Sequence, residues 1–223
     1  MRLYKIGLLL ILMVGAVLLL YPTVSEKWNA KRQSRALLEY DQNVQQLQEQ
    51  ERQKLLEEAK RYNEQLAAKG ETDLSYEQVL NIDGRGIMGY GLLPKIHVEL
   101  PIYHGTSEAV LQKGVGHMEG TSLPVGGDSA HCVLSSHRGL PSARLFTDLD
   151  QLMMGDTFQL KVLNQVREYT IDQILVVEPH EMDALRIVKG QDYCTLVTCT
   201  PYGINSHRML IRGRCTMVST EDM

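Results

Sequence analysis

The sequence of 223 residues lacks an excess of basic side chains, because 23 Lys and Arg stand against 27 Asp and Glu. A net charge of −4 argues against nucleic acid as a partner, since phosphate binding needs a basic surface. The sequence also lacks proline and glycine between Pro22 and Gly70, which favours helix there. A hydrophobic fraction of 43% is enough to build a core and excludes a chain that is disordered throughout.

Motifs for metals and nucleotides are also missing. The glycine-rich stretch 114–120 has one residue too many for a dinucleotide fingerprint, and Ala184 stands where a zinc-protease helix needs its second histidine. Paired Cys-x-x-Cys spacing is absent among the four cysteines, so we expect neither a metal nor a cofactor. The sequence leaves open whether a disulfide forms among Cys132, Cys194 and Cys215.

The N-terminus carries a membrane signal. Residues 6–21 form an uncharged, strongly apolar run behind Arg2 and Lys5. The run is near the length of a spanning helix, and no clear small-x-small cleavage site follows it. We therefore expect residues 1–25 to be an uncleaved anchor in the cell membrane, with the rest of the chain extracellular. A cleaved signal peptide is the alternative.

Residues 26–70 are rich in helix-forming side chains and contain two apolar stripes at helical spacing. The step from Leu47 to Leu55 puts the stripes out of phase, which predicts a kinked helix or two helices that end at Gly70. This segment is either a spacer that holds the remainder away from the membrane or a helix packed against it.

Residues 71–223 form the third predicted domain, in which apolar and polar residues mostly alternate with a period of two. A single helix is expected from Ser142 to about Leu152, so the pattern indicates a β-barrel or sandwich. The expected strands are short and rich in β-branched and aromatic residues, at 95–103, 130–135, 157–163, 168–177, 193–198 and 208–212.

Three side chains near predicted strand ends form a candidate thiol-nucleophile site. Cys199 closes one strand, Arg208 opens the next, and His137 follows a third. An imidazole can raise the thiolate fraction and later protonate a leaving amine, while a guanidinium can stabilise a developing oxyanion. Spacing alone does not make this trio specific.

The longer blocks around these residues resemble the sortases, and in particular the class C, pilin-polymerising type. The run Thr195-Leu-Val-Thr-Cys199 with its downstream Arg208 is the most specific part of a resemblance that extends from about Gly86 to Arg214. It implies a closed eight-stranded β-barrel with a groove on its outer wall. It also assigns His137, Cys199 and Arg208 as catalytic, and we expect Thr198 to contact the substrate.

The resemblance implies a transpeptidase that cleaves a Leu-Pro-x-Thr-Gly-like (LPXTG-like) signal between Thr and Gly through a thioacyl intermediate. The expected partners are LPXTG-bearing pilins or surface proteins and an amine acceptor, most simply a pilin Lys. Transfer to a peptidoglycan amine, hydrolysis by a cysteine hydrolase, and a non-catalytic envelope scaffold are the alternatives.

Two departures from the class C pattern bear on regulation. Class C sortases usually carry a lid with an Asp-Pro-aromatic motif, whereas residues 70–78 contain no proline. We therefore expect an open groove, with Tyr76 as a plug over the cysteine in the alternative. Many members also end in a second hydrophobic span, which residues 219–223 do not form, so we expect the N-terminal anchor alone.

Overall fold

The computed structural model describes residues 2–221, with a closed β-barrel as its centre. Two helices precede the barrel: α1, Arg2–Gln46, and α2, Glu49–Lys69. The strands follow the order β1-β2-β3-β4-β7-β8-β6-β5 around the barrel. Their bounds are β1 Ile87–Leu93, β2 Val98–His104, β3 Val115–His117, β4 Ala130–Ser135, β5 Thr157–Val162, β6 Gln165–Val177, β7 Asp192–Thr200 and β8 His207–Thr220. The fold is therefore the mainly β, eight-stranded barrel that the sequence predicts.

The short helices lie in the connections between strands. Helix α3, Glu108–Leu111, joins β2 to β3, and single 3-10 turns occur at Pro94–Ile96, Leu149–Gln151 and Asp183–Leu185. The helix expected from Ser142 to Leu152 is wrong, because the segment contains only irregular turns and the single 3-10 turn at Leu149–Gln151. Leu145 has a φ of 42°, a left-handed conformation that an α-helix cannot contain.

Strands β1 and β3 were absent from the sequence prediction because both contain glycines. A β-carbon on Gly89 of β1 would lie 2.3 Å from the carbonyl oxygen of Lys161, and one on Gly116 of β3 would lie 2.4 Å from that of Gly105. These glycines permit a close approach of neighbouring backbone. In the sequence alone, glycines such as Gly89 and Gly116 are typical of turns rather than of strands.

The two stripes of residues 26–70 fall on two helices. Helix α1 runs without a break across residue 25, and α2 begins after Gln48, whose backbone N–H is accepted by the Glu51 carboxylate at 2.9 Å. Helix α2 ends at Gly70, which has a φ of 75° and whose N–H donates to the carbonyl of Leu66.

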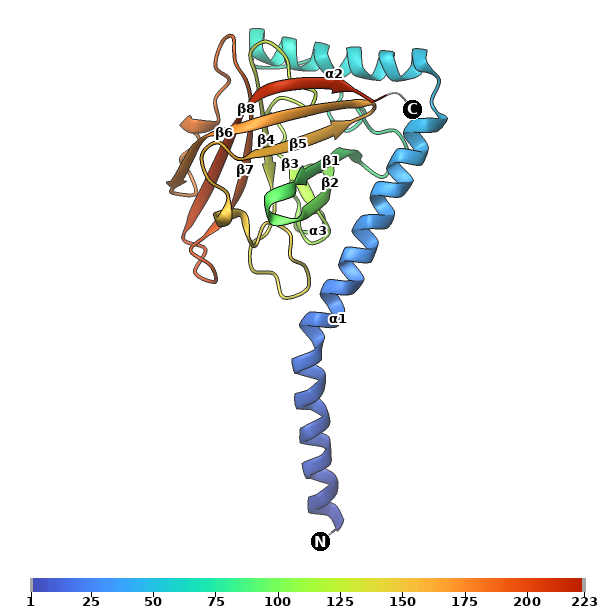
Figure 1. Cartoon of the computed structure of the whole chain (residues 1–223), viewed down its shortest axis with the longest axis vertical. Coiled ribbons are helices and arrows are strands. Elements are labelled where there is room, and N and C mark those ends of the chain that lie inside the picture. The colour runs from blue at the N-terminus through green and yellow to red at the C-terminus, as the bar shows by residue number, and fades with distance from the viewer. Residues whose placement is uncertain (1, 222–223) are drawn as a thin grey trace.

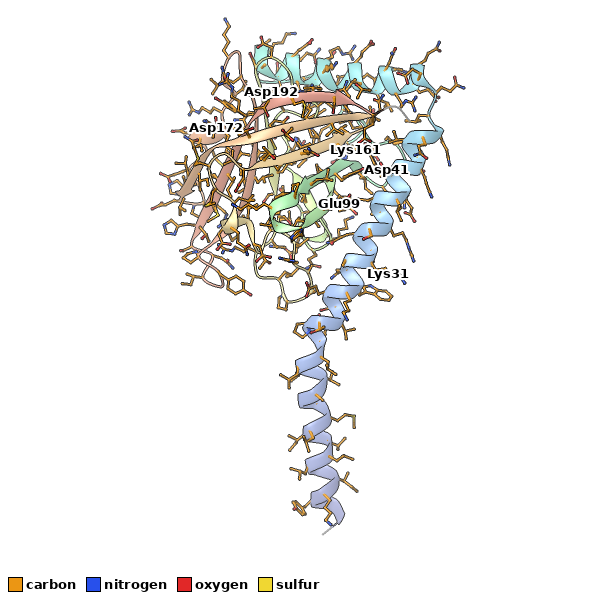
Figure 2. All side chains as sticks on the ribbon, in the orientation of Figure 1. Lys31, Asp41, Glu99, Lys161, Asp172 and Asp192 are labelled. Atoms are coloured by element: carbon orange, nitrogen blue, oxygen red, sulfur yellow. The ribbon has the colours of Figure 1, made fainter. Side chains whose placement is uncertain are left out.

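Both helices are packed against the barrel, as Figure 1 shows for the second half of α1 and for α2. The Tyr40 hydroxyl donates to the Met88 carbonyl at 3.0 Å and accepts from the Leu163 amide at 2.8 Å. Asp41 of α1 also faces Lys161 of β5 at 3.5 Å (Figure 2). The buried residues thus support a packed helix rather than a free spacer for this part of the segment; they are Leu37, Tyr40 and Val44 of α1 and Ala59, Tyr62 and Leu66 of α2.

The N-terminal part of α1 projects away from the barrel (Figure 1). It contains an 18-residue window with a mean hydropathy of 2.4, none of which is buried against the rest of the chain. Long apolar side chains such as Leu9, Leu12 and Leu19 are therefore exposed. This helix has the length and composition to cross a membrane.

The four cysteines are free thiols in the structure. Cys132 of β4 and Cys194 of β7 are register partners inside the barrel and are fully buried. Cys199 and Cys215 are partly exposed.

Tyr76 lies in the core, where it does not serve as a plug over Cys199. Its side chain is buried, and its hydroxyl lies 3.0 Å from both Nδ1 and the carbonyl oxygen of His117. The same hydroxyl accepts from the Gly105 amide at 2.8 Å. Three partners at the β2–β3 end of the barrel thus hold the ring.

Candidate active site

Strands β4 and β7 run parallel and side by side, and their register brings His137 to Cys199. Each β7 residue pairs with the β4 residue numbered 62 lower, up to Ser135 with Val197. Continued for two residues, this register places His137 beside Cys199. Neighbouring strands lie about 4.8 Å apart, so the imidazole and the thiol start from adjacent positions on the sheet.

Two side-chain hydrogen bonds maintain the register beyond the end of β4. The Thr198 hydroxyl donates to the Ser136 carbonyl at 2.9 Å, and Arg138 Nη1 donates to the Thr200 hydroxyl at 3.3 Å. Each bond joins residues that are 62 apart, one on either side of His137. The residue before His137 and the residue after it are therefore each bonded to β7. We call this pair of hydrogen bonds the register bracket.

Arg208 lies on the other side of the cysteine. Strands β7 and β8 are antiparallel, and Cys199 and Arg208 are direct register partners. Arg208 Nη1 donates to the carbonyls of Asn205 and His207 at 3.2 and 3.1 Å, which holds the guanidinium at the start of β8. The sheet thus presents imidazole, thiol and guanidinium in one row across β4, β7 and β8.

Two other basic residues of β8, Arg212 and His207, are engaged elsewhere. Arg212 forms two hydrogen bonds with Asp172, at 2.9 and 3.0 Å, and its guanidinium covers the Tyr193 ring (Figure 2 labels Asp172). The Nδ1 of His207 lies 2.8 Å from the Ser206 hydroxyl in the connecting loop. Neither side chain belongs to the row that contains Cys199.

The outer wall of the barrel carries an apolar strip that leads to the cysteine. Val197 lies two residues before Cys199, pairs with Leu210 of β8, and packs with Val133 and Leu185 in a cluster separate from the barrel core. At its far end, a depression of about 420 Å³ lies between α2, the β3–β4 loop and the β6–β7 loop. The partly buried hydrophobic residues of the strip are Met118, Leu175, Val177 and Ala184. An extended peptide could lie along this strip and reach the thiol.

Thr198, which we expect to contact the substrate, is buried in the barrel wall. Its side chain is 1% exposed and points to the opposite side of the sheet from Cys199, because successive side chains alternate. Its hydroxyl is bonded within the protein, to Ser136. In this position a peptide on the outer wall does not reach it.

Sequence reasoning missed two residues next to His137. Arg138 is a neighbour in the chain, but its partners, the Thr147 carbonyl and the Asp150 carboxylate, come from the β4–β5 connection, where the sequence predicted a helix. Glu108 lies 29 residues earlier, on α3, and its Oε1 is 3.2 Å from His137 Nε2. Nothing in the sequence indicates that Glu108 and His137 lie next to each other in the folded chain.

No cluster of three or more His, Cys, Asp or Glu side chains suited to a metal occurs within residues 2–221. The thiol, imidazole and guanidinium of the row are the groups that can supply a nucleophile, an acid–base partner and a cation.

Comparisons with known proteins show the family of the chain. Residues 92–216, more than half of the chain, match the family model of the sortase domain. The chain belongs to the sortase family. Members of this family are cysteine transpeptidases, and the row of His137, Cys199 and Arg208 lies within the matched residues.

Solved class C sortases resemble this sortase over most of the chain. Sortase C1 from Streptococcus agalactiae is 49% identical with a TM-score of 0.79, over 82% of this chain and 98% of that one. Sortase C of Clostridium perfringens, solved with the C-terminal cell wall sorting motif, is 43% identical with a TM-score of 0.77, over 82% and 99%. A curated sortase A of S. agalactiae is 29% identical over 134 residues, which are 57% of this chain and only about half, 54%, of that relative.

Proposed function

We propose that this sortase cleaves an LPXTG-like sorting signal between Thr and Gly and transfers the acyl group to an amine, most simply a Lys side chain of a pilin, so that pili are built. The observation that carries the proposal is the row of imidazole, thiol and guanidinium at the end of an apolar strip on the outer wall. The likeness to class C sortases supports the pilin as substrate, and the sorting motif solved with the C. perfringens relative supports the peptide class.

In the proposed first half-reaction, the Cys199 thiolate attacks the carbonyl carbon of the Thr–Gly bond. Arg208 is adjacent to Cys199 and stabilises the negative charge on the carbonyl oxygen. The intermediate collapses as the C–N bond breaks and the His137 imidazolium protonates the departing glycine amine. The products are a thioester on Cys199 and a free amino group.

In the second half-reaction, an amine attacks the thioester and His137 accepts a proton from it. The C–S bond breaks, the thiolate is restored, and a new amide joins the two proteins. A covalent intermediate predicts ping-pong kinetics. The apolar strip suits the Leu and Pro side chains of the signal, because hydrophobic surface favours apolar ligands.

Thr198 is proposed here to position the row rather than to bind substrate. Together with Arg138 it forms the register bracket around His137. The three domains proposed are an anchor at 1–25, a helical segment at 26–70 and the catalytic barrel at 71–223. In this scheme the exposed apolar part of α1 spans the cell membrane and the barrel lies outside the cell.

The test is incubation of the full chain, in detergent or nanodiscs, with a purified LPXTG-bearing pilin that contains its acceptor Lys. Covalent ladders on a denaturing gel are expected, and Cys199→Ala and His137→Ala should abolish them. Cys215→Ala removes another partly exposed thiol, outside the row, and should leave them unchanged.

Each alternative has its own outcome in this assay. Released signal without ladders, even with amine present, would indicate a hydrolase. Transfer only to a peptidoglycan-type amine would indicate wall anchoring. A thiol at Cys199 that neither cleaves the signal nor reacts faster than Cys215 with a thiol reagent would indicate a scaffold.

A further inference from the structure

A carboxylate lies against the outer nitrogen of the catalytic imidazole. Glu108 is the first residue of α3, and its Oε1 lies 3.2 Å from Nε2 of His137. The imidazole is 27% exposed, whereas the carboxylate is 66% exposed. Within residues 2–221, no hydrogen-bond partner faces the other ring nitrogen, Nδ1, of His137.

The position of Glu108 is fixed by its own helix. Gln112 Nε2, one turn later, donates to the same Oε1 at 2.9 Å. This hydrogen bond, and after it the charge of His137, lower the pKa of Glu108, so the group is a carboxylate near neutral pH.

The segment that carries Glu108 is also tied to the strand that carries His137. The Ser136 hydroxyl donates to the Gly114 carbonyl, three residues after α3, at 2.9 Å. Gly116 of β3 lies so close to the start of the α3 segment that a β-carbon there would be 2.4 Å from the Gly105 carbonyl. Helix α3 and the catalytic histidine are therefore held as one unit.

We infer that Glu108 is a positioning residue for His137, which accepts the Nε2–H and leaves Nδ1 to exchange protons with the thiol and the amines. This inference rests on the proposed function and adds a residue to it. A neutral histidine whose Nε2–H is bonded keeps the tautomer with an unprotonated Nδ1. Glu108 itself exchanges no proton in either half-reaction.

The expected effect on rate is moderate because the pair is exposed to solvent. Glu108→Ala is expected to lower kcat for signal cleavage about 5–10-fold with KM within about twofold, since the interaction acts on the histidine and not on the peptide. Glu108→Gln keeps an acceptor oxygen and should recover most of the loss. Glu99→Gln, at an exposed carboxylate of β2 outside the row (Figure 2), is the matched control and should behave as the parent chain.

A second measurement is independent of turnover. Nitrogen-15 NMR of the His137 ring, assigned with His137→Gln, should show the Nε2–H tautomer in the parent chain and in Glu108→Gln, and a mixture of tautomers in Glu108→Ala. An unchanged tautomer, or an unchanged kcat in Glu108→Ala, overturns the inference while the proposed function stands. If the parent chain itself does not cleave the signal, the proposed function fails, and the NMR result still decides whether Glu108 sets the tautomer.

Discussion

The register bracket can be broken at one atom. Thr198→Val keeps the size and branching of the side chain and removes only the hydroxyl that donates to the Ser136 carbonyl at 2.9 Å. That carbonyl is then left without this donor in a buried part of the barrel wall, because Thr198 is 1% exposed. An unsatisfied buried acceptor costs about 1–3 kcal/mol. The chain can recover part of this free energy if Ser136 turns toward water, which moves the attached His137 away from the thiol.

We therefore expect Thr198→Val to lower kcat for signal cleavage about tenfold, equivalent to about 1.4 kcal/mol in the barrier, with KM unchanged. Thr198→Ser is the matched variant: it keeps the hydroxyl and loses a methyl group, which reduces stability by about 0.8 kcal/mol but should leave kcat near that of the parent chain. Steady-state cleavage of a fluorogenic sorting peptide and urea unfolding of the same preparations give both quantities.

The two variants separate a positioning role from substrate binding. If Thr198 contacts the peptide, Thr198→Val should raise KM and leave kcat intact. If Thr198→Val cleaves the peptide with the kcat and KM of the parent chain, the bracket does not position His137 and the reasoning from the register is refuted.

Two further predictions follow from the row and from the wall of the barrel. Arg208→Ala should lower kcat about 10²–10³-fold through loss of the oxyanion donor, whereas Arg212→Ala should cleave at close to the parent rate; equal rates for Arg208→Ala and the parent chain would contradict the oxyanion role. Burial lowers the pKa of His131, whose ring nitrogens lie 2.9 Å from the Arg186 carbonyl and 2.7 Å from the Thr195 hydroxyl. As the pH falls, the unfolded chain binds a proton at His131 before the folded chain does, so the contribution of His131 to the free energy of unfolding is complete above about pH 6.5 and is lost as the pH drops through the lowered pKa. His131→Gln should therefore reduce the difference between the free energies of unfolding measured in urea at pH 7.5 and at pH 5. An unchanged difference would exclude His131 as its source.

The barrel was predictable where its strands follow ordinary patterns. Strands β4 to β8 alternate or carry β-branched residues, and all five were expected within a few residues of their observed bounds, apart from the longer β8. Strand β2 begins at Val98 rather than residue 95, because Pro94–Ile96 forms a 3-10 turn. Strands β1 and β3 depend on glycines that allow backbones to touch, and such contacts exist only after the barrel has closed.

The row of His137, Cys199 and Arg208 was predictable in part because strand ends can be located from local sequence. A cysteine near the end of β7 and an arginine near the start of β8 must be near each other if the two strands pair as a hairpin, and here they are direct partners. The place of His137 depends on the parallel pairing of β4 with β7, which lie far apart in the chain. Local patterns do not determine such a pairing, so strand ends suggested His137 without making it specific, and the family resemblance assigned it.

The supporting residues could not be found in this way, because their role depends on register. A shift of β4 by one residue against β7 would turn the neighbour of Cys199 to the other face of the sheet and bury it in the core. Thr198 and Arg138 support the observed register beyond the last ladder pair, since each bond joins residues that are 62 apart. Their side chains therefore specify the geometry of the thiol and the imidazole without touching either, and a motif that marks reactive groups does not distinguish them from ordinary core and loop residues.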